Sequence, residues 1–291
     1  MDPVVIFNKY SMSEAQTDKL VECVRAGFTP STKQWIAILT SLHVKIAIKC
    51  VSLVDVIDPK CLIPVIKRRH QRLFEEVIMK IKTIPDETIN VLMTVTPFYL
   101  YVCLQAGLNP NTVLTNKETP LDFACRKSKR SHIHVLLNNS RIIVSTNTCR
   151  DIIRHQSRFA SKAVEICQNL CISFILEIII VNDSKALNTI MEKFETKFKG
   201  NGVWMDIQHL IRCPISLEFS TDLVKTPSNH LFDRVCLLTW LNKHANNPMT
   251  RETLHESDLQ YRHTFLPQLI KELQEKLEQL YAEFRPSTPP V

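Results

Sequence analysis

The chain has 291 residues, of which 45% are hydrophobic and 22% are charged. This length suits about two domains with a real buried core. With four glycines in total, the sequence excludes the glycine-rich loops that cradle phosphates in nucleotide enzymes. The longest apolar run, residues 171–181, contains Glu177 and is shorter than the roughly 20 residues of a membrane span. The ten cysteines lack paired spacing, so we expect reduced thiols and a cytoplasmic location.

The formal net charge of +7 raises the question of a nucleic-acid partner, because clustered Lys and Arg release counterions from phosphates. The densest basic clusters are residues 67–70 and 126–130. Both are short and lack interleaved aromatic side chains on which bases would stack. Solvated helix ends or loops explain these two basic clusters better, so we expect no nucleic-acid partner. An acidic partner protein is equally compatible with the clusters.

Two glycines mark predicted helix ends in the first half of the chain. Gly27 lies in V-R-A-G-F-T-P and Gly107 lies in L-Q-A-G-L-N-P. In each case a helix is expected to end with glycine just after it and proline beyond. Residues 33–53, 59–81 and 87–106 read as helix pairs, at intervals shorter than the usual repeat of about 33 residues.

Residues 117–125 read K-E-T-P-L-D-F-A-C, and I-H-V-L-L-N-N follows at 133–139. This pattern resembles an ankyrin repeat, in which T-P-L-x-x-A opens the first helix. The resemblance implies an ankyrin-like α-solenoid over residues 1–140, which would bind a protein on its extended surface. An all-helical spacer without a ligand is the alternative.

Residues 141–200 are expected to form a helical extension. Cys167 and Cys171 lie one helical turn apart there, a spacing that could hold a metal, although buried thiols are favoured because no His or carboxylate pair accompanies them. Residues 199–202, K-G-N-G, are the best candidate for a linker to the next domain.

Residues 205–270 predict a small α+β domain. The sequence T-P-S-N at 226–229 is turn chemistry, so residues 223–225 and 230–232 are expected to form a hairpin. Asp233 is a good N-cap for a following helix, and Asn246-Asn247-Pro248 ends that helix.

A domain of this size commonly needs a metal as a staple. The two cysteines and five histidines between residues 205 and 270 include no C-x-x-C or H-x3-H pair, so we expect neither a zinc site nor a cofactor.

Four ordered pieces, C-P-I-S-L-E, T-P-S-N-H-L-F-D-R, Trp240-Leu241 and N-P-M-T-R, resemble a U-box. The U-box is the zinc-free relative of the RING domain, and it recruits ubiquitin-conjugating enzymes. The resemblance implies that apolar contacts to the conjugating enzyme come from two loops and the central helix. It also implies that one basic residue, Arg251, contacts both ubiquitin and the enzyme and so favours the reactive arrangement. The residues assigned to this interface are Ile215, Leu217, Trp240, Pro248 and Arg251.

In U-boxes the metal is replaced by polar bonds among side chains of the same loops, and such networks hold when every member is satisfied. The sequence departs from the family pattern where Asn229 replaces the usual turn glycine, Phe232 replaces a hydroxylated aromatic residue, and Leu217 replaces an aromatic residue found in some members. The expected network consists of Glu218, Ser228, Asn229, Asp233 and Asn247.

Residues 271–291 are expected to complete a C-terminal helix and a disordered tail. The helix has a leucine seam that would cap the domain or pair with a second copy, giving a homodimer. The seam consists of Leu269, Leu273, Leu277 and Leu280.

The sequence therefore predicts a mainly α protein with N-terminal helical repeats and a small zinc-free C-terminal domain. The resemblances imply a ubiquitin ligase whose repeats bind a substrate protein and whose U-box recruits the charged conjugating enzyme, without a covalent ubiquitin intermediate. By analogy, this combination suggests a secreted effector or viral protein acting in a host cytoplasm. The alternatives are a non-catalytic interaction scaffold and a ligase with Cys213 or Cys236 as nucleophile.

Overall fold

The computed structural model describes residues 14–284, and the predicted disordered tail at 285–291 lies outside them. Within the described residues the protein is mainly α-helical, with one small three-stranded sheet in the C-terminal part. The chain divides into two compact units, Met1–Ile142 and Ile143–Val291. Among residues 14–284, no helix has both the length and the apolar character needed to cross a lipid bilayer.

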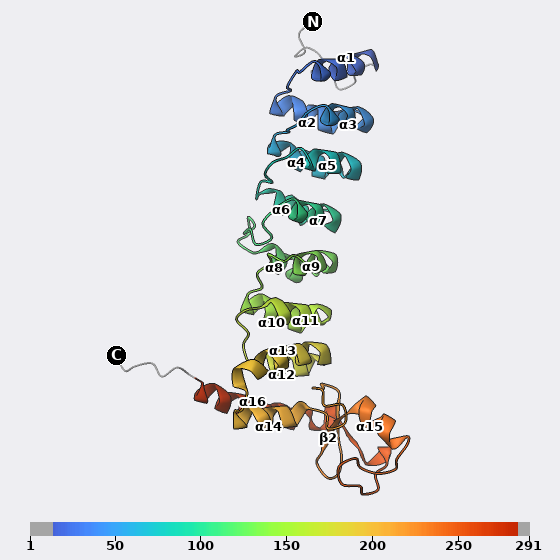
Figure 1. The fold of residues 1–291 in the computed structure, drawn as a ribbon, viewed down its shortest axis with the longest axis vertical. Helices are drawn as coiled ribbons and strands as arrows, with labels where there is room; N and C mark the ends of the chain where they lie inside the picture. Colours follow the sequence, from blue (N-terminus) through green and yellow to red (C-terminus); the bar gives the residue numbers. More distant parts are fainter. Residues whose placement is uncertain (1–13, 285–291) are drawn as a thin grey trace, which may run out of the picture. The chain divides into compact units, whose positions relative to one another are not determined.

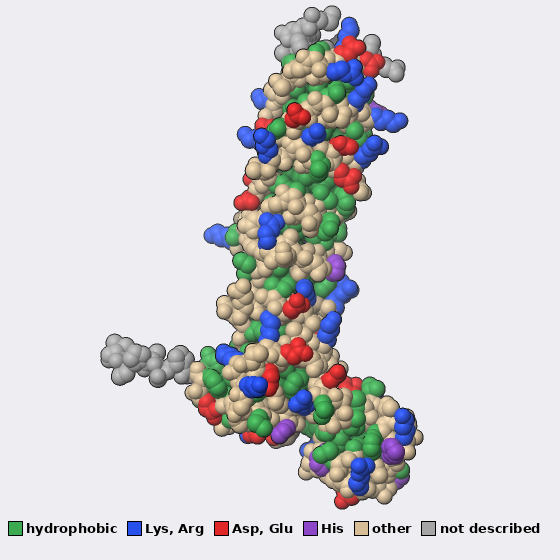
Figure 2. All heavy atoms as spheres, in the orientation of Figure 1, with side chains coloured by type: hydrophobic (Ala, Val, Ile, Leu, Met, Phe, Trp, Pro, Cys, Tyr) green, Lys and Arg blue, Asp and Glu red, His purple; other side chains and the backbone are tan. Residues whose placement is uncertain are grey.

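Unit 1 is a stack of helix pairs joined by loops (Figure 1). The pairs follow one another with first helix against first helix and second against second, as in the contacts of α2 with α4, α4 with α6, and α3 with α5. Lys and Arg side chains project from this stack on the face drawn in Figure 2. The helices are α1 (Glu14–Arg25), α2 (Thr32–Ser41), α3 (Val44–Ser52), α4 (Leu62–Arg68), α5 (Gln71–Ile78), α6 (Thr88–Leu92), α7 (Pro97–Gln105), α8 (Pro120–Arg126) and α9 (Arg130–Leu137).

The predicted helix pairs at 33–53, 59–81 and 87–106 are confirmed, and local chemistry explains their ends. Gly27 and Gly107 have φ values of +97° and +105°, a left-handed conformation that glycine adopts without a steric penalty. The next amide in each case reaches back to close the helix, Phe28 to the Cys23 carbonyl and Leu108 to the Cys103 carbonyl, both at 3.0 Å. Both predicted helix ends are therefore confirmed.

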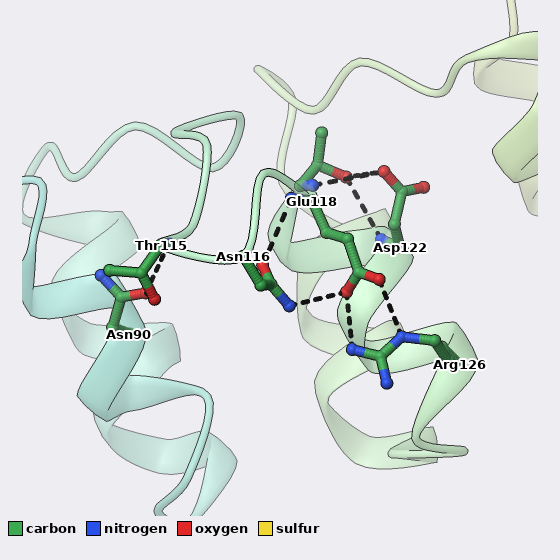
Figure 3. Close-up of polar contacts among 7 residues, drawn as sticks. Asn90, Thr115, Asn116, Glu118, Asp122 and Arg126 are labelled. Atoms are coloured by element: carbon green, nitrogen blue, oxygen red, sulfur yellow. Dashed lines mark hydrogen bonds and ion pairs between the residues drawn. The ribbon is translucent and has the colours of Figure 1, made fainter.

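The threonine of the T-P-L-D sequence, Thr119, is the N-cap of α8. The Thr119 hydroxyl accepts the Asp122 amide, and the Asp122 carboxylate accepts the Thr119 amide, which makes a capping box (Figure 3). Beside it, Arg126 makes a two-pronged ion pair with Glu118, at 2.7 and 2.8 Å. The loop before α8 also docks on the preceding pair, because the Thr115 amide donates to the Asn90 side chain at 3.2 Å.

Arginine side chains join successive pairs of unit 1 by bonding to carbonyl groups at helix ends. The Arg141 guanidinium donates to the Leu104 and Leu108 carbonyls at 2.9 and 2.8 Å, just after the end of α7. The Leu104 carbonyl also accepts the Gly107 amide at 3.2 Å, so the guanidinium adds a second donor to a carbonyl of the last turn of α7, where intrahelical partners run out. The apolar faces between the layers are fully buried, and they include Leu39, Val51, Ile66, Phe74, Leu100 and Ile133.

Unit 2 begins with helices and ends with the sheet-containing domain. The three strands are antiparallel in the order β2-β1-β3, with Val224 opposite both Phe232 and Tyr261. The elements are α10 (Thr146–His155), α11 (Ala160–Ile166), α12 (Phe174–Val181), α13 (Ser184–Phe198), α14 (Gly202–Ile211), β1 (Leu223–Lys225), β2 (Leu231–Asp233), α15 (Arg234–Leu241), β3 (Gln260–Tyr261) and α16 (Arg262–Glu283).

The interpretation that Cys167 and Cys171 share a helical face is wrong. Cys167 is the C-cap of α11 with ψ of 121°, and the chain does not become helical again until Phe174. Gln168 and Asn169 follow the cap, and asparagine competes for backbone bonds in turns rather than helices. The two thiols therefore lie in a connection between helices.

The end of α13 leads directly into α14, so the K-G-N-G sequence is a helix-to-helix turn. Asn201 caps α14 by accepting the Trp204 amide at 2.9 Å. The leucine seam of α16 is buried, and α16 packs against α14 of the same chain. Because these leucines are already covered, a homodimer would need a different surface.

Candidate functional site

The C-terminal domain is built on a small core shared by the hairpin, α15 and the two long loops. Phe232 and Leu237 are fully buried in it, and the helix is fixed at its start by Asp233, whose carboxylate accepts the Cys236 amide at 3.0 Å. The predicted hairpin and the predicted N-cap are both confirmed. The core side chains are Cys213, Val224, Phe232, Leu237, Leu254 and Leu259.

The first loop, residues 213–218, is a tight turn closed by two backbone bonds. The Cys213 amide donates to the Glu218 carbonyl at 2.9 Å, and the Leu217 amide donates to the Cys213 carbonyl at 2.9 Å. Leu217 has a φ of +61°, which costs free energy for a residue with a Cβ atom. The Arg212 guanidinium holds this conformation by donating to the Leu217 carbonyl at 2.7 Å.

The second loop, residues 247–252, has the same geometry. The Asn247 amide donates to the Glu252 carbonyl at 2.8 Å, and the Arg251 amide donates to the Asn247 carbonyl at 2.9 Å. Arg251 has a φ of +66° and so occupies the place of Leu217. The sequences C-P-I-S-L-E and N-P-M-T-R-E are thus two copies of one loop shape, which projects Leu217 from one loop and Arg251 from the other.

Asn247 is the residue that pins the second loop from inside. It is 2% exposed, its side-chain oxygen accepts the Met249 and Thr250 amides, and its side-chain amide donates to the Ser228 hydroxyl at 2.8 Å. Ser228 in turn bonds to His230 at 3.1 Å, within the β1–β2 turn. The second loop and the hairpin turn are therefore locked together by side-chain polar bonds.

The other expected network residues lie elsewhere. Asp233 accepts the Ser220 hydroxyl at 2.8 Å in addition to capping α15. Asn229 is exposed and supplies the left-handed position of the hairpin turn, with a φ of +63°. Glu218 has an exposed side chain and takes part in the first loop through its backbone carbonyl. The structure thus brings together Ser228 and Asn247 and places Asp233 in a second cluster.

The expected interface residues lie on the two loops and α15. Leu217 is 62% exposed, while Ile215 is half-buried against the core. Trp240 is half-buried and donates its indole N–H to the Asn246 carbonyl at 3.0 Å. The Arg251 guanidinium lies 5.8 Å from the centre of the Trp240 ring, within cation–π range. Pro248 is half-buried at the start of the second loop.

Met249, which the sequence analysis did not assign to the interface, lines a groove of about 460 Å³. Met249 is 55% exposed and lines this groove together with Leu217, so the two loops present neighbouring apolar side chains. The signal was available in the sequence, because Met249 stands in N-P-M-T-R where Ile215 stands in C-P-I-S-L. A methionine at such a surface adapts to irregular partner shapes.

The first loop is fixed to the rest of unit 2 by α13. The Asn188 side chain donates to the Phe219 carbonyl at 2.9 Å and accepts the Phe219 amide at 3.1 Å. Beside it, the Ser184 hydroxyl bonds to the Thr221 hydroxyl at 2.8 Å. These contacts orient the first loop from a helix that precedes the domain.

The thiols of this domain are poorly suited to nucleophilic catalysis. Cys213 is fully buried in the core. Burial, together with the neighbouring Asp233, raises the pKa of the Cys236 thiol to about 11. Because the thiolate is the reactive form, neither residue is an activated nucleophile. Among residues 14–284 there is also no group of three His, Cys, Asp or Glu side chains placed to hold a metal ion.

Residues 209–276 match the U-box domain family. The match begins within α14, includes both loops and the hairpin, and ends within α16. U-box domains are generally modules of ubiquitin ligases, which gives this domain a coarse functional class. This match does not extend to the helix pairs of residues 1–140, so their resemblance to ankyrin repeats rests on the sequence pattern alone. Comparison with curated proteins and with solved structures gives no match.

Proposed function

We propose that the protein is a ubiquitin ligase of the scaffold type, in which the U-box recruits a ubiquitin-charged conjugating enzyme and the helix pairs hold the substrate. The observation that carries this proposal is the pair of equivalent loops, which project Leu217 from one loop and, from the other, Arg251 beside Trp240. Such a surface suits a shallow docking contact with another protein.

The proposed mechanism needs no covalent step on this chain. Ile215, Leu217 and Pro248 contact the conjugating enzyme, and Arg251 restrains the thioester-linked ubiquitin in the arrangement that a substrate lysine attacks. Acceleration then comes from positioning the reactants. The high pKa of Cys236 supports this mechanism over one in which ubiquitin is first transferred to a cysteine of the ligase.

The test combines the pure protein with ubiquitin, the activating enzyme and a panel of conjugating enzymes. The proposal predicts ubiquitin chains or self-modification with at least one member of the panel. Ile215→Ala or Pro248→Ala should abolish the product, whereas Thr239→Ala, on the exposed side of α15, should leave it unchanged. A folded protein that is inactive with every member would instead be a non-catalytic interaction scaffold.

A further inference from the structure

The net charge of the protein is concentrated in unit 1. Residues 1–142 contain 19 Lys and Arg against 12 Asp and Glu, whereas residues 143–291 contain 17 against 17. The entire formal charge of +7 is therefore carried by the stacked helix pairs. The proposed U-box function does not use this charge.

The tight turns within the helix pairs lie along one edge of the stack, here named the turn edge (Figure 1). Side-chain contacts connect successive helix pairs along this edge. Arg68, at the end of α4, donates to the Leu42 carbonyl in the α2–α3 turn. Phe74, in the middle of α5, contacts Tyr99, near the start of α7, with ring centres 4.8 Å apart. The His132 side chain in α9 bonds to the backbone of Val95 in the α6–α7 turn.

The four turn segments of the turn edge contain basic residues and no carboxylate. Residues 42–46, 67–72, 93–98 and 126–131 include no Asp or Glu. The opposite edge, formed by loops 53–60, 79–87 and 106–119, mixes four lysines with five acidic residues. Arg126 is neutralised by Glu118, and Arg68 is bonded to backbone carbonyls. The remaining basic residues of the turn edge are Lys45, Lys67, Arg69, Arg72, Lys127, Lys129 and Arg130.

Helix electrostatics explain part of this pattern. Lys67 lies in the last turn of α4, where a positive charge stabilises the helix. Arg72 and Arg130, however, lie in the first turns of α5 and α9, where a carboxylate would be favoured instead. Arg69 also occupies a left-handed position, with a φ of +58°, that would suit glycine better. Helix stability therefore does not explain the positions of these three charges.

We infer that the turn edge binds an extended acidic segment of the substrate protein, an inference that rests on the proposed ligase function. Two exposed basic clusters, one in the α4–α5 turn and one in the α8–α9 turn, flank the uncharged α6–α7 turn. Helices pack about 8–10 Å apart, so the clusters lie roughly 20 Å apart. About six residues of extended chain span that distance. The matching ligand has two groups of Asp or Glu separated by about six neutral residues.

A nucleic acid fits the turn edge less well. Its phosphate charge is uniform, so the uncharged turn between the clusters would leave phosphates without partners. The one ring of Phe, Tyr or Trp in the turn segments, Phe98, is half-buried and contacts Phe74, which leaves no exposed ring there for stacking bases. A polypeptide with spaced acidic groups is therefore the better match.

The test measures binding of labelled ligands to the full chain at physiological ionic strength. The ligands are a peptide with two acidic triplets separated by six neutral residues, a peptide of the same composition with its acidic residues contiguous, and a single-stranded DNA of equal charge. The turn-edge variant carries Arg69→Gln, Arg72→Gln, Lys129→Gln and Arg130→Gln. The control variant carries Lys33→Gln, Lys60→Gln, Lys82→Gln and Lys117→Gln, so both variants lose four positive charges.

The spaced peptide should bind more tightly than the other two ligands. Its Kd should rise at least about tenfold in the turn-edge variant and less than about twofold in the control variant, since four exposed charge contacts are lost in the first and none in the second. The inference would be overturned if the two variants lost equal affinity for the spaced peptide. It would also be overturned if the wild-type protein bound the contiguous peptide or the DNA more tightly than the spaced peptide.

A second measurement separates this inference from the proposed function. Discharge of ubiquitin from a conjugating enzyme onto free lysine uses only the U-box, so both charge variants should support it at the wild-type rate. If the wild-type protein fails in that reaction, the ligase function is refuted while the peptide measurement still stands as a test of the turn edge. If discharge proceeds but the spaced peptide does not bind, the turn-edge inference alone fails.

Discussion

Asn247 donates its side-chain amide to the Ser228 hydroxyl at 2.8 Å, and this bond connects the second loop of the C-terminal domain to the β1–β2 turn. Here a buried amide satisfies two loop amides and one hydroxyl, so the loop is held by neutral hydrogen bonds.

Asn247→Ala should destabilise the C-terminal domain by about 2–3 kcal/mol, because two backbone amides and the Ser228 hydroxyl lose a buried partner. Hydrogen exchange of the Met249 and Thr250 amides would show the loss locally as faster exchange. Asn242→Ala, at an exposed position after α15, is the matched control and should change stability by less than about 0.5 kcal/mol. Equal effects of the two substitutions would mean that Asn247 does not pin the loop.

Arg141→Lys should loosen the end of α7. The guanidinium reaches the Leu104, Gly107 and Leu108 carbonyls, whereas a lysine ammonium lacks the planar fork needed to bond to several of them at once. The expected loss of local stability at the end of α7 is about 1 kcal/mol, because the guanidinium is partly exposed to solvent. Hydrogen exchange over residues 97–108 measures it, and Arg25→Lys, exposed at the end of α1, should have no effect. Unchanged protection of α7 in Arg141→Lys would contradict this assignment.

The Thr32 hydroxyl gives unit 1 a defined pH dependence. It donates to the Asp58 carboxylate at 2.5 Å, and together with the Lys60 amide it lowers the pKa of Asp58. The folded pKa lies below the unfolded value of about 3.9, so ionised Asp58 stabilises the fold above about pH 4. This contribution disappears as the pH falls through the folded pKa.

Thr32→Val should therefore lower the Tm at pH 7, and the difference from the wild type should shrink as the pH falls below about 4. Thermal unfolding over this range is the measurement. Thr40→Val is the control, since that hydroxyl donates to the Ile36 carbonyl, a group that does not titrate. A Tm difference for Thr32→Val that stays constant with pH would remove Asp58 from the explanation.

Cys236→Ser should leave any ligase activity intact, because the thiol is half-buried and its pKa is raised to about 11. Reactions stopped without reductant should show no ubiquitin thioester on the wild-type chain, a readout that also covers Cys213. A ubiquitin adduct that disappears on adding reductant would support a cysteine mechanism instead.

Local turn chemistry made much of the fold predictable. The glycines at 27 and 107, the T-P-S-N turn and the Asp233 cap each act within a few residues, so their signals survive without tertiary information. The left-handed conformations of Leu217 and Arg251 were not predictable, because neither residue type favours them and the surrounding bonds impose them.

Long-range contacts explain the rest of what the sequence could not show. Asn188 and Phe219 are separated by 31 residues, and no local pattern pairs them. Likewise, the helix break between α11 and α12 was not predictable from the apolar residues around Cys167, because hydrophobic periodicity cannot distinguish one buried helix from two. The equivalence of the two loops, in contrast, was visible in the shared Pro and Glu of C-P-I-S-L-E and N-P-M-T-R-E.

In the proposed mechanism, Arg251 acts on the thioester from the second loop. The most direct measurement is single-turnover discharge of ubiquitin from a conjugating enzyme onto free lysine, with and without the protein. Wild-type protein should accelerate discharge, and Arg251→Gln should lose at least about tenfold of that acceleration, since positioning terms of this kind carry the rate. Glutamine bears the same left-handed backbone cost as arginine, and Arg234→Gln, on the exposed side of α15, should behave as wild type. Full acceleration by Arg251→Gln, or none by folded wild-type protein with any conjugating enzyme, would contradict the account.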